Sequence, residues 1–140
     1  MIWCENGVGK SAMGENVWTS GKFIGTATSA QLSDLAEKYT CKNQLPIGTI
    51  VTIGEDEEFD IETCTIDDIP FGIISDKPGF ILDENLENSL PVAMIGKTLV
   101  LVKGSIKKGQ PITLGSDGTT KATNFNTNDV IMGRSLETIT

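Results

Sequence analysis

Short apolar runs bounded by glycine are the main pattern of the chain from residue 48 onward. The clearest run begins after Gly48, continues through Ile50 to Ile53 and ends at Gly54. A glycine turn, an apolar run of about five residues and a second glycine are typical of a β-strand between tight turns. Polar and apolar side chains alternate strictly over residues 58–62, which predicts a second, half-buried strand.

The same pattern returns 61 residues later, which indicates an internal duplication. The aligned blocks are residues 48–54 with 109–115 and residues 69–74 with 130–135. Two blocks that agree on one separation without a gap favour a repeated strand–turn unit. We therefore expect pseudo-repeats at residues 48–75 and 109–136. A glycine inside the last strand of each copy, Gly72 or Gly133, indicates a bulge or a close approach of the backbone.

Residues 91–104, between the two copies, are mostly apolar and have Gly96-Lys97 at their centre. Glycine at the first central position of a two-residue loop predicts a hairpin with a type II′ turn. Short strands with glycine turns throughout predict an all-β fold, either a small β-barrel or a sandwich.

Residues 29–39 are the exception to this pattern. Leu32, Leu35, Ala36 and Tyr39 follow helical spacing, and Ser29 is a candidate N-cap. This spacing predicts a helix of about three turns, with a strand as the alternative.

Residues 1–28 are rich in glycine and serine and differ from the rest of the chain, so we treat them as an extended N-terminal arm before a β-rich domain at residues 29–140. The arm holds three aromatic side chains, Trp3, Trp18 and Phe23. One interpretation is a flexible terminus. The other is an arm whose aromatic rings bury against a neighbouring subunit, which makes these three residues candidate inter-subunit contacts.

Composition and charge exclude several classes of partner. Hydrophobic residues make up 39% of the chain and charged residues 21%, which is typical of a globular domain. A net charge of −8 argues against a nucleic-acid partner, because phosphates are bound by basic surfaces. No apolar run is long enough to cross a bilayer, so we expect no membrane partner.

The residue types needed for catalysis and metal binding are scarce. The chain has no histidine, which removes the usual general base and the commonest metal ligand. The three cysteines, Cys4, Cys41 and Cys64, have no CxxC spacing, so we expect free thiols and leave a single disulfide open. The Gly9-Lys10-Ser11 fragment lacks the strand and the first glycine of a phosphate-binding loop. We therefore predict no enzyme activity, no cofactor and no metal site.

Charge is distributed unevenly between the two copies. Eight acidic residues and no basic ones lie between Glu55 and Asp68. A calcium loop would need a D-x-D-x-D-G order that is absent, so a solvated hairpin tip is the favoured interpretation. Four lysines precede the second copy and are expected to face the acidic surface of an adjacent subunit. These lysines are Lys97, Lys103, Lys107 and Lys108.

Several short phrases occur in an order that resembles one family. The phrases are ATSAQLSDLAEKY at residues 27–39, LPIGTIV at 45–51, GIIS at 72–75 with Pro78, PVAMIGK at 91–97, VKGSIKKGQ at 102–110 and IMGRSLE at 131–137. Together they are similar to bacteriophage virion proteins, namely capsid decoration or head-fibre proteins and the C-terminal regions of tail fibres. In the family phrase an aromatic residue stands where this chain has Leu32.

The resemblance implies a β-rich structural subunit of a virion, often a trimer, assembled in the cytoplasm of the host bacterium. It also implies that residues 30–39 are extended rather than helical. The chain is too short to carry a fibre shaft, and no self-cleaving dyad matches. We therefore expect a capsid decoration or minor capsid protein whose partners are major capsid proteins. A short tail or tail-fibre component bound to tail proteins is the alternative, and a carbohydrate-binding module is a third.

Overall fold

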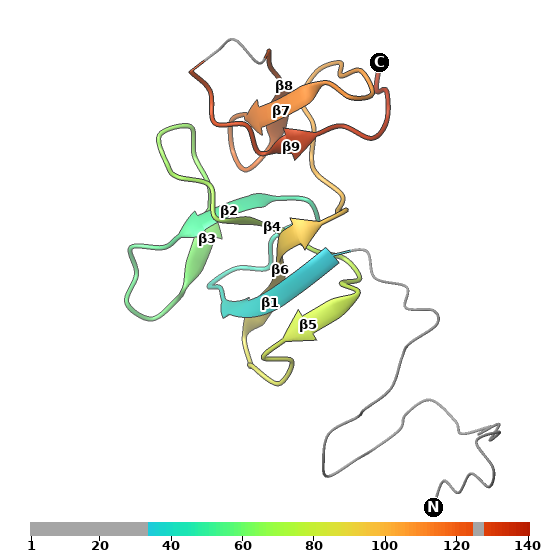
Figure 1. The fold of residues 1–140 in the computed structure, drawn as a ribbon. Coiled ribbons are helices and arrows are strands. Elements are labelled where there is room, and N and C mark those ends of the chain that lie inside the picture. Colours follow the sequence, from blue (N-terminus) through green and yellow to red (C-terminus); the bar gives the residue numbers. More distant parts are fainter. Residues whose placement is uncertain (1–33, 125–127) are drawn as a thin grey trace, which may run out of the picture.

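The computed structural model describes residues 34–124 and 128–140, and every regular element in them is a β-strand (Figure 1). The prediction of an all-β fold is therefore confirmed. The strands are β1 (Asp34–Thr40), β2 (Ile50–Ile53), β3 (Ile61–Thr63), β4 (Gly72–Ile74), β5 (Phe80–Leu82), β6 (Ser89–Gly96), β7 (Pro111–Leu114), β8 (Thr120–Ala122) and β9 (Gly133–Arg134). The expected arm, residues 1–28, lies outside the described residues.

The strands form two sheets. The larger one has the order β3-β2-β4-β6-β1-β5, with β1 and β6 paired antiparallel and β5 paired parallel with the other side of β1. The smaller one has the order β8-β7-β9, and both of its pairings are antiparallel. Figure 1 shows the smaller sheet next to the β2–β4 part of the larger one, with β5 at the far end. In the described part of the chain neither sheet closes into a barrel.

The two aligned segments have matching strand order and register. We call residues 48–75 the first unit and residues 109–136 the second unit; β2 and β7 are their middle strands. In the first unit β2 pairs with β4 through Ile50–Ile73 and Val51–Gly72, and in the second β7 pairs with β9 through Pro111–Arg134 and Ile112–Gly133. Each of these residues lies 61 positions from its counterpart, as 50 does from 111.

The third strand of each unit also matches, after a turn of different length. Ile53 pairs with Ile61 across residues 54–60, and Leu114 pairs with Thr120 across residues 115–119. The longer turn explains why the strand expected at residues 58–62 begins only at Ile61.

Side-chain hydrogen bonds and bridges outside the strands follow the same correspondence. The Thr52 hydroxyl donates to the Ile69 carbonyl at 2.9 Å, and the Thr113 hydroxyl donates to the Val130 carbonyl at 2.8 Å. A residue upstream of each unit forms an isolated parallel bridge to the unit's third strand. These bridges join Cys41 to Ile61 and Val102 to Thr120. The match therefore extends about eight residues upstream of the segments aligned in the sequence.

The helix predicted for residues 29–39 is wrong wherever the structure describes that segment. Residues 34–40 form β1 instead, and all seven pair with β6. Asp34 and Ala36 are buried while Leu35 is exposed, which is the alternation of a strand. The extended conformation implied by the resemblance is therefore correct for residues 34–39, and residues 29–33 lie outside the described residues.

The hairpin predicted at Gly96-Lys97 is also wrong. β6 ends at Gly96, and the chain then leaves the larger sheet. The Leu101 amide donates to the Gly48 carbonyl at 2.9 Å, and the Leu101 carbonyl accepts from the Thr120 amide at 2.7 Å. The segment therefore links the two units instead of returning along β6.

Two apolar clusters hold the described residues together. The first lies within the larger sheet and contains Cys41, Val51, Ile61, Ile74, Leu90 and Val92. The second joins the units and contains Ile50, Cys64 and Leu114, with Ile73 and Met132 packed against it. At Gly72 a Cβ would lie 2.3 Å from the Val92 side chain, so the predicted close approach is confirmed there.

Candidate interaction surfaces

The larger sheet carries an exposed apolar row at its β5 end. Leu35 of β1 pairs with Phe80 on one side and with Ile95 on the other, so the three side chains are cross-strand neighbours. Their exposed fractions are 37%, 56% and 70%, and Leu82 adds 42% two residues beyond Phe80. We call Leu35, Phe80, Leu82 and Ile95 the β5 surface. The sequence analysis missed it, although a run of three apolar residues before an acidic loop was a signal for this strand.

The backbone of β5 adds a second feature to this surface. Among the described strands β5 pairs only with β1, so its outer edge is open. Natural sheets usually cover or charge such edges, because an apolar open edge recruits another chain. Apolar side chains and unpaired backbone groups therefore occur together here, next to the point where residues 1–33 join β1. Trp3, Trp18 and Phe23, the three candidate contacts, lie outside the described residues.

A groove of about 520 Å³ separates the start of β1 from the smaller sheet. Its apolar lining includes Ile73, Leu99, Val100, Val102, Ile106, Ile112, Met132, Leu136 and Ile139, and its polar lining includes Asp34, Ser75, Asp76, Lys77, Arg134 and Glu137. The hydroxyl of Ser75, a buried residue, donates to the Asp34 carboxylate at 2.6 Å, which fixes the start of β1 against the end of β4. The groove is therefore lined by both apolar and polar side chains.

Two acidic residues of the first unit, Asp60 and Asp68, accept hydrogen bonds from the backbone. The Asp60 carboxylate accepts from the Thr40 amide at 2.9 Å and from its hydroxyl at 2.7 Å. The Asp68 carboxylate accepts from the Thr65 amide at 2.6 Å, and the hydrogen bonds with Thr65 lower the pKa of Asp68. In the described ranges no group of three or more cysteine, aspartate or glutamate residues is placed to hold a metal ion. Residues 55–58, at the tip between β2 and β3, are all exposed, which supports the interpretation of that part of the acidic stretch as a solvated hairpin tip.

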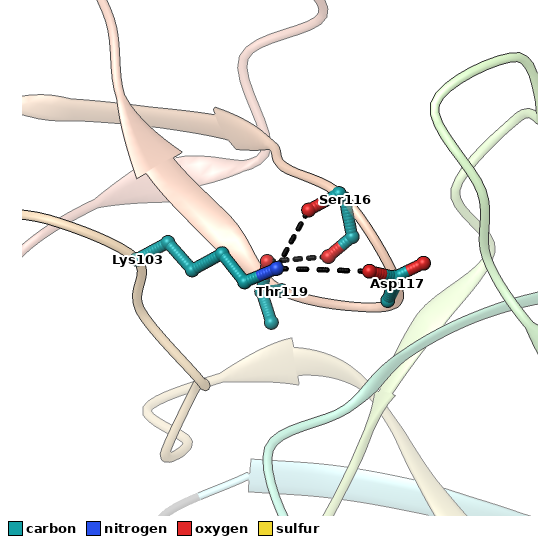
Figure 2. Close-up of polar contacts among 4 residues, drawn as sticks. All are labelled: Lys103, Ser116, Asp117 and Thr119. Carbon is teal, nitrogen blue, oxygen red and sulfur yellow. Dashed lines mark hydrogen bonds and ion pairs between the residues drawn. The ribbon is translucent and has the colours of Figure 1, made fainter.

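The side chain of Lys103, one of the four lysines, makes polar contacts within its own chain. Lys103 donates to the Ser116 hydroxyl at 2.7 Å, and its Nζ lies 3.6 Å from the Asp117 carboxylate. Figure 2 shows its ammonium group directed at the turn between β7 and β8, which the Thr119 hydroxyl closes by donating to the Ser116 carbonyl at 2.6 Å. Lys103 therefore orients the turn of the second unit, and a role of Lys97, Lys107 and Lys108 toward another subunit stays a prediction.

The two cysteines in the described residues are buried free thiols, Cys41 in the first cluster and Cys64 in the second. Burial and the nearby Asp68 carboxylate raise the pKa of the Cys64 thiol to about 11. A thiol with such a pKa stays protonated at neutral pH and is a poor nucleophile, so Cys64 behaves as a core residue. Cys4 lies outside the described residues.

No helix in the described residues is long and apolar enough to span a membrane. No family model, no curated protein and no solved structure matches this chain.

Proposed function

We propose that this protein is a structural component of a bacteriophage particle, specifically a capsid decoration or minor capsid (head-fibre) protein that binds and stabilises the shell. The observation that carries a binding role is the β5 surface, an apolar patch on an open sheet edge. The ordered phrases between residues 27 and 137 support the virion as the place of action. In this proposal the chain needs no catalytic residue and no cofactor, and it acts by contact alone.

Binding through the β5 surface follows from the apolar area that it exposes. Removing apolar area from water contributes about 25 cal/mol per Å², and rigid strands lose little conformational entropy when a partner covers them. The partner is a major capsid protein or another copy of the chain in a trimer. In this proposal Trp3, Trp18 and Phe23 of the arm bury against the neighbouring subunit, the subunit assembles in the host cytoplasm, and neither nucleic acid nor membrane is bound.

A second candidate is a short tail or tail-fibre component, an adaptor or a receptor-binding tip. The family resemblance favours it as well, because the same phrases occur in tail-fibre ends. The two candidates differ in copy number. A decoration protein covers a shell built of hundreds of subunits, whereas a tail ring holds about six to twelve copies by closed symmetry.

Quantitative mass spectrometry of purified particles tests the proposal. We expect a copy number in the hundreds, in a fixed ratio to the major capsid protein. A count near six to twelve would favour the tail candidate, and absence from particles would contradict both.

The role of the β5 surface is tested with a matched pair of variants. Phe80→Ser with Ile95→Ser should leave the unfolding transition close to that of the native chain but prevent incorporation into particles. Ile69→Ser is the control, because Ile69 is 84% exposed on the first unit, away from this surface. Equal incorporation of both variants would exclude the β5 surface as the docking site. Deletion of residues 1–28 tests the arm in the same assay.

A further inference from the structure

Two backbone hydrogen bonds join the units, and a third joins the first unit to the segment that precedes the second unit. The Leu101 amide donates to the Gly48 carbonyl at 2.9 Å. The Ile50 amide donates to the Gly118 carbonyl at 2.7 Å, and the Gly118 amide donates to the Cys64 carbonyl at 2.9 Å. The turn of the second unit is thus held between β2 and the segment that follows β3. The first unit contributes one face to this contact and the second unit contributes a different face.

Apolar side chains seal the contact. Ile50, Cys64 and Ile73 of the first unit meet Leu114 and Met132 of the second. Because the units match strand for strand, the face that each unit uses in this contact has an equivalent on the other unit. Each equivalent face lies at a free end of the pair. If these equivalents were unchanged, a further copy of the chain could dock at either end. A contact between different faces that does not close into a ring continues as an open series.

The free end of the second unit lacks the groups that such a contact needs. Pro111 stands in the position of Ile50 and has no amide hydrogen to donate. Arg134 stands in the position of Ile73 and places a charge on the face. Its Nε also donates to the carbonyl of Gly109 at 3.0 Å, so the counterpart of the Gly48 acceptor is already occupied.

The free end of the first unit is closed as well. Thr40 stands in the position of Leu101, and its amide donates to the Asp60 carboxylate at 2.9 Å. The turn at residues 54–60 takes the place of the turn at residues 115–119 and has Phe59 in the position of Gly118. It carries four consecutive acidic residues, Glu55, Asp56, Glu57 and Glu58, all exposed. A docking glycine such as Gly118 is absent from the described turn.

We propose that the faces used in the contact between the units have equivalents at the two free ends of the pair, where a second copy of this chain would dock head to tail. Asp60 closes the free end of the first unit, and Pro111 and Arg134 close that of the second. The protein is therefore a finite pair of units that does not extend into a filament through this contact. This inference does not depend on the proposed function. Any homo-oligomer uses other surfaces, such as the β5 surface.

Two half-open variants test the proposal. In the first, Pro111→Ile and Arg134→Ile give the second unit the residues found in the first. In the second, residues 54–60 are replaced by the sequence of residues 115–119, which removes Asp60 and supplies a glycine. Each variant alone should keep the mass of the native chain in sedimentation velocity. An equimolar mixture should form a one-to-one complex of twice that mass, and a chain with both changes should grow with concentration.

The native chain and a folding check are the controls. If both variants keep a cooperative unfolding transition and their mixture does not associate, the proposal is overturned. Open-ended growth of the native chain that persists in the Phe80→Ser, Ile95→Ser variant would also overturn it. Phe59→Gly with Asp60→Thr, which copies Gly118 and Thr119 without changing the length of the turn, is a second variant for the first unit, for use if the turn replacement does not fold. Its mixture with the Pro111→Ile, Arg134→Ile variant should also gain mass, and no gain would again count against the proposal.

Discussion

The first and second units have the same backbone hydrogen bonds in different surroundings. β2 lies inside a six-stranded sheet and is covered by the second unit, whereas β7 is the middle of a three-stranded sheet. Gly72 lies against Val92 of β6, whereas a Cβ added at its counterpart Gly133 would meet, among the described residues, only the Ile112 side chain, at 4.0 Å. The comparison teaches that the strand–turn pattern specifies the unit, whereas its neighbours decide how much each residue contributes to stability.

The largest effect is expected where the two units touch. Gly118 has a φ of 68°, and a Cβ there would lie 2.6 Å from the Thr49 side chain and 3.0 Å from the Ile50 carbonyl. Gly118→Ala should lower the free energy of unfolding by about 3 kcal/mol or more, from backbone strain and overpacking together. Gly104→Ala is the control, because Gly104 has a φ of 82° and a Cβ added there would meet no atom of the described residues within 4 Å. It should cost about 1–2 kcal/mol. Equal losses in urea denaturation would contradict the close contact between the units.

The next effect separates equivalent positions in the two units. Gly72→Ala should destabilise by about 1–3 kcal/mol, because its Cβ would overlap the Val92 side chain. Gly133→Ala should change stability by less than about 0.5 kcal/mol. The same denaturation series measures both, and a larger loss at Gly133 would reverse the assigned surroundings.

Much of the strand layout could be predicted from the sequence, because it depends on local turns and a repeated pattern. The apolar runs bounded by glycine, which recur with the separation between Gly48 and Gly109, were enough to place β2, β4, β7 and β9. β1 was missed because Leu35 and Ala36 fit helical spacing, and only the distant β6 supplies the ladder that makes this segment a strand. No local pattern reports such a partner.

The interaction surfaces were harder to predict for the same reason. Phe80 and Ile95 are 15 positions apart and become neighbours only through Leu35. The capping role of Arg134 depends on its counterpart, Ile73, facing the other unit. The sequence shows that the first unit is more acidic than the second. That the acidic turn lies at a free end of the pair becomes apparent only from the contact between the units.

A pH effect is expected from Cys64 in the cluster that joins the units. Its pKa in the folded chain is raised to about 11, so the unfolded chain loses the thiol proton first as pH rises. Stability should therefore fall between about pH 9 and pH 11, by up to about 1.4 kcal/mol for each unit of pKa difference. Cys64→Ala should remove this part of the slope. An identical slope in urea denaturation of both proteins would contradict the burial of this thiol.

The smallest effect concerns a contact that both units share. Thr52→Val and Thr113→Val each remove a hydroxyl that donates to a backbone carbonyl, at 2.9 Å and 2.8 Å. Each should cost about 1 kcal/mol, and the two costs should agree within the error of thermal denaturation. A clear difference between them would show that the two units are not equivalent at this contact.

Amide hydrogen exchange at the junction tests most directly whether the two units form one docked pair. The account predicts that the amides of Ile50, Leu101 and Gly118 exchange as slowly as those of the core strands. Ile50 and Gly118 donate between the units, and Leu101 donates from the linking segment to the first unit. The Thr40 amide, bonded to the exposed Asp60 carboxylate, should exchange faster than its counterpart Leu101. Rapid exchange of Leu101 and Gly118, at the rate of the exposed Ser116 and Asp117 amides, would contradict the docked pair.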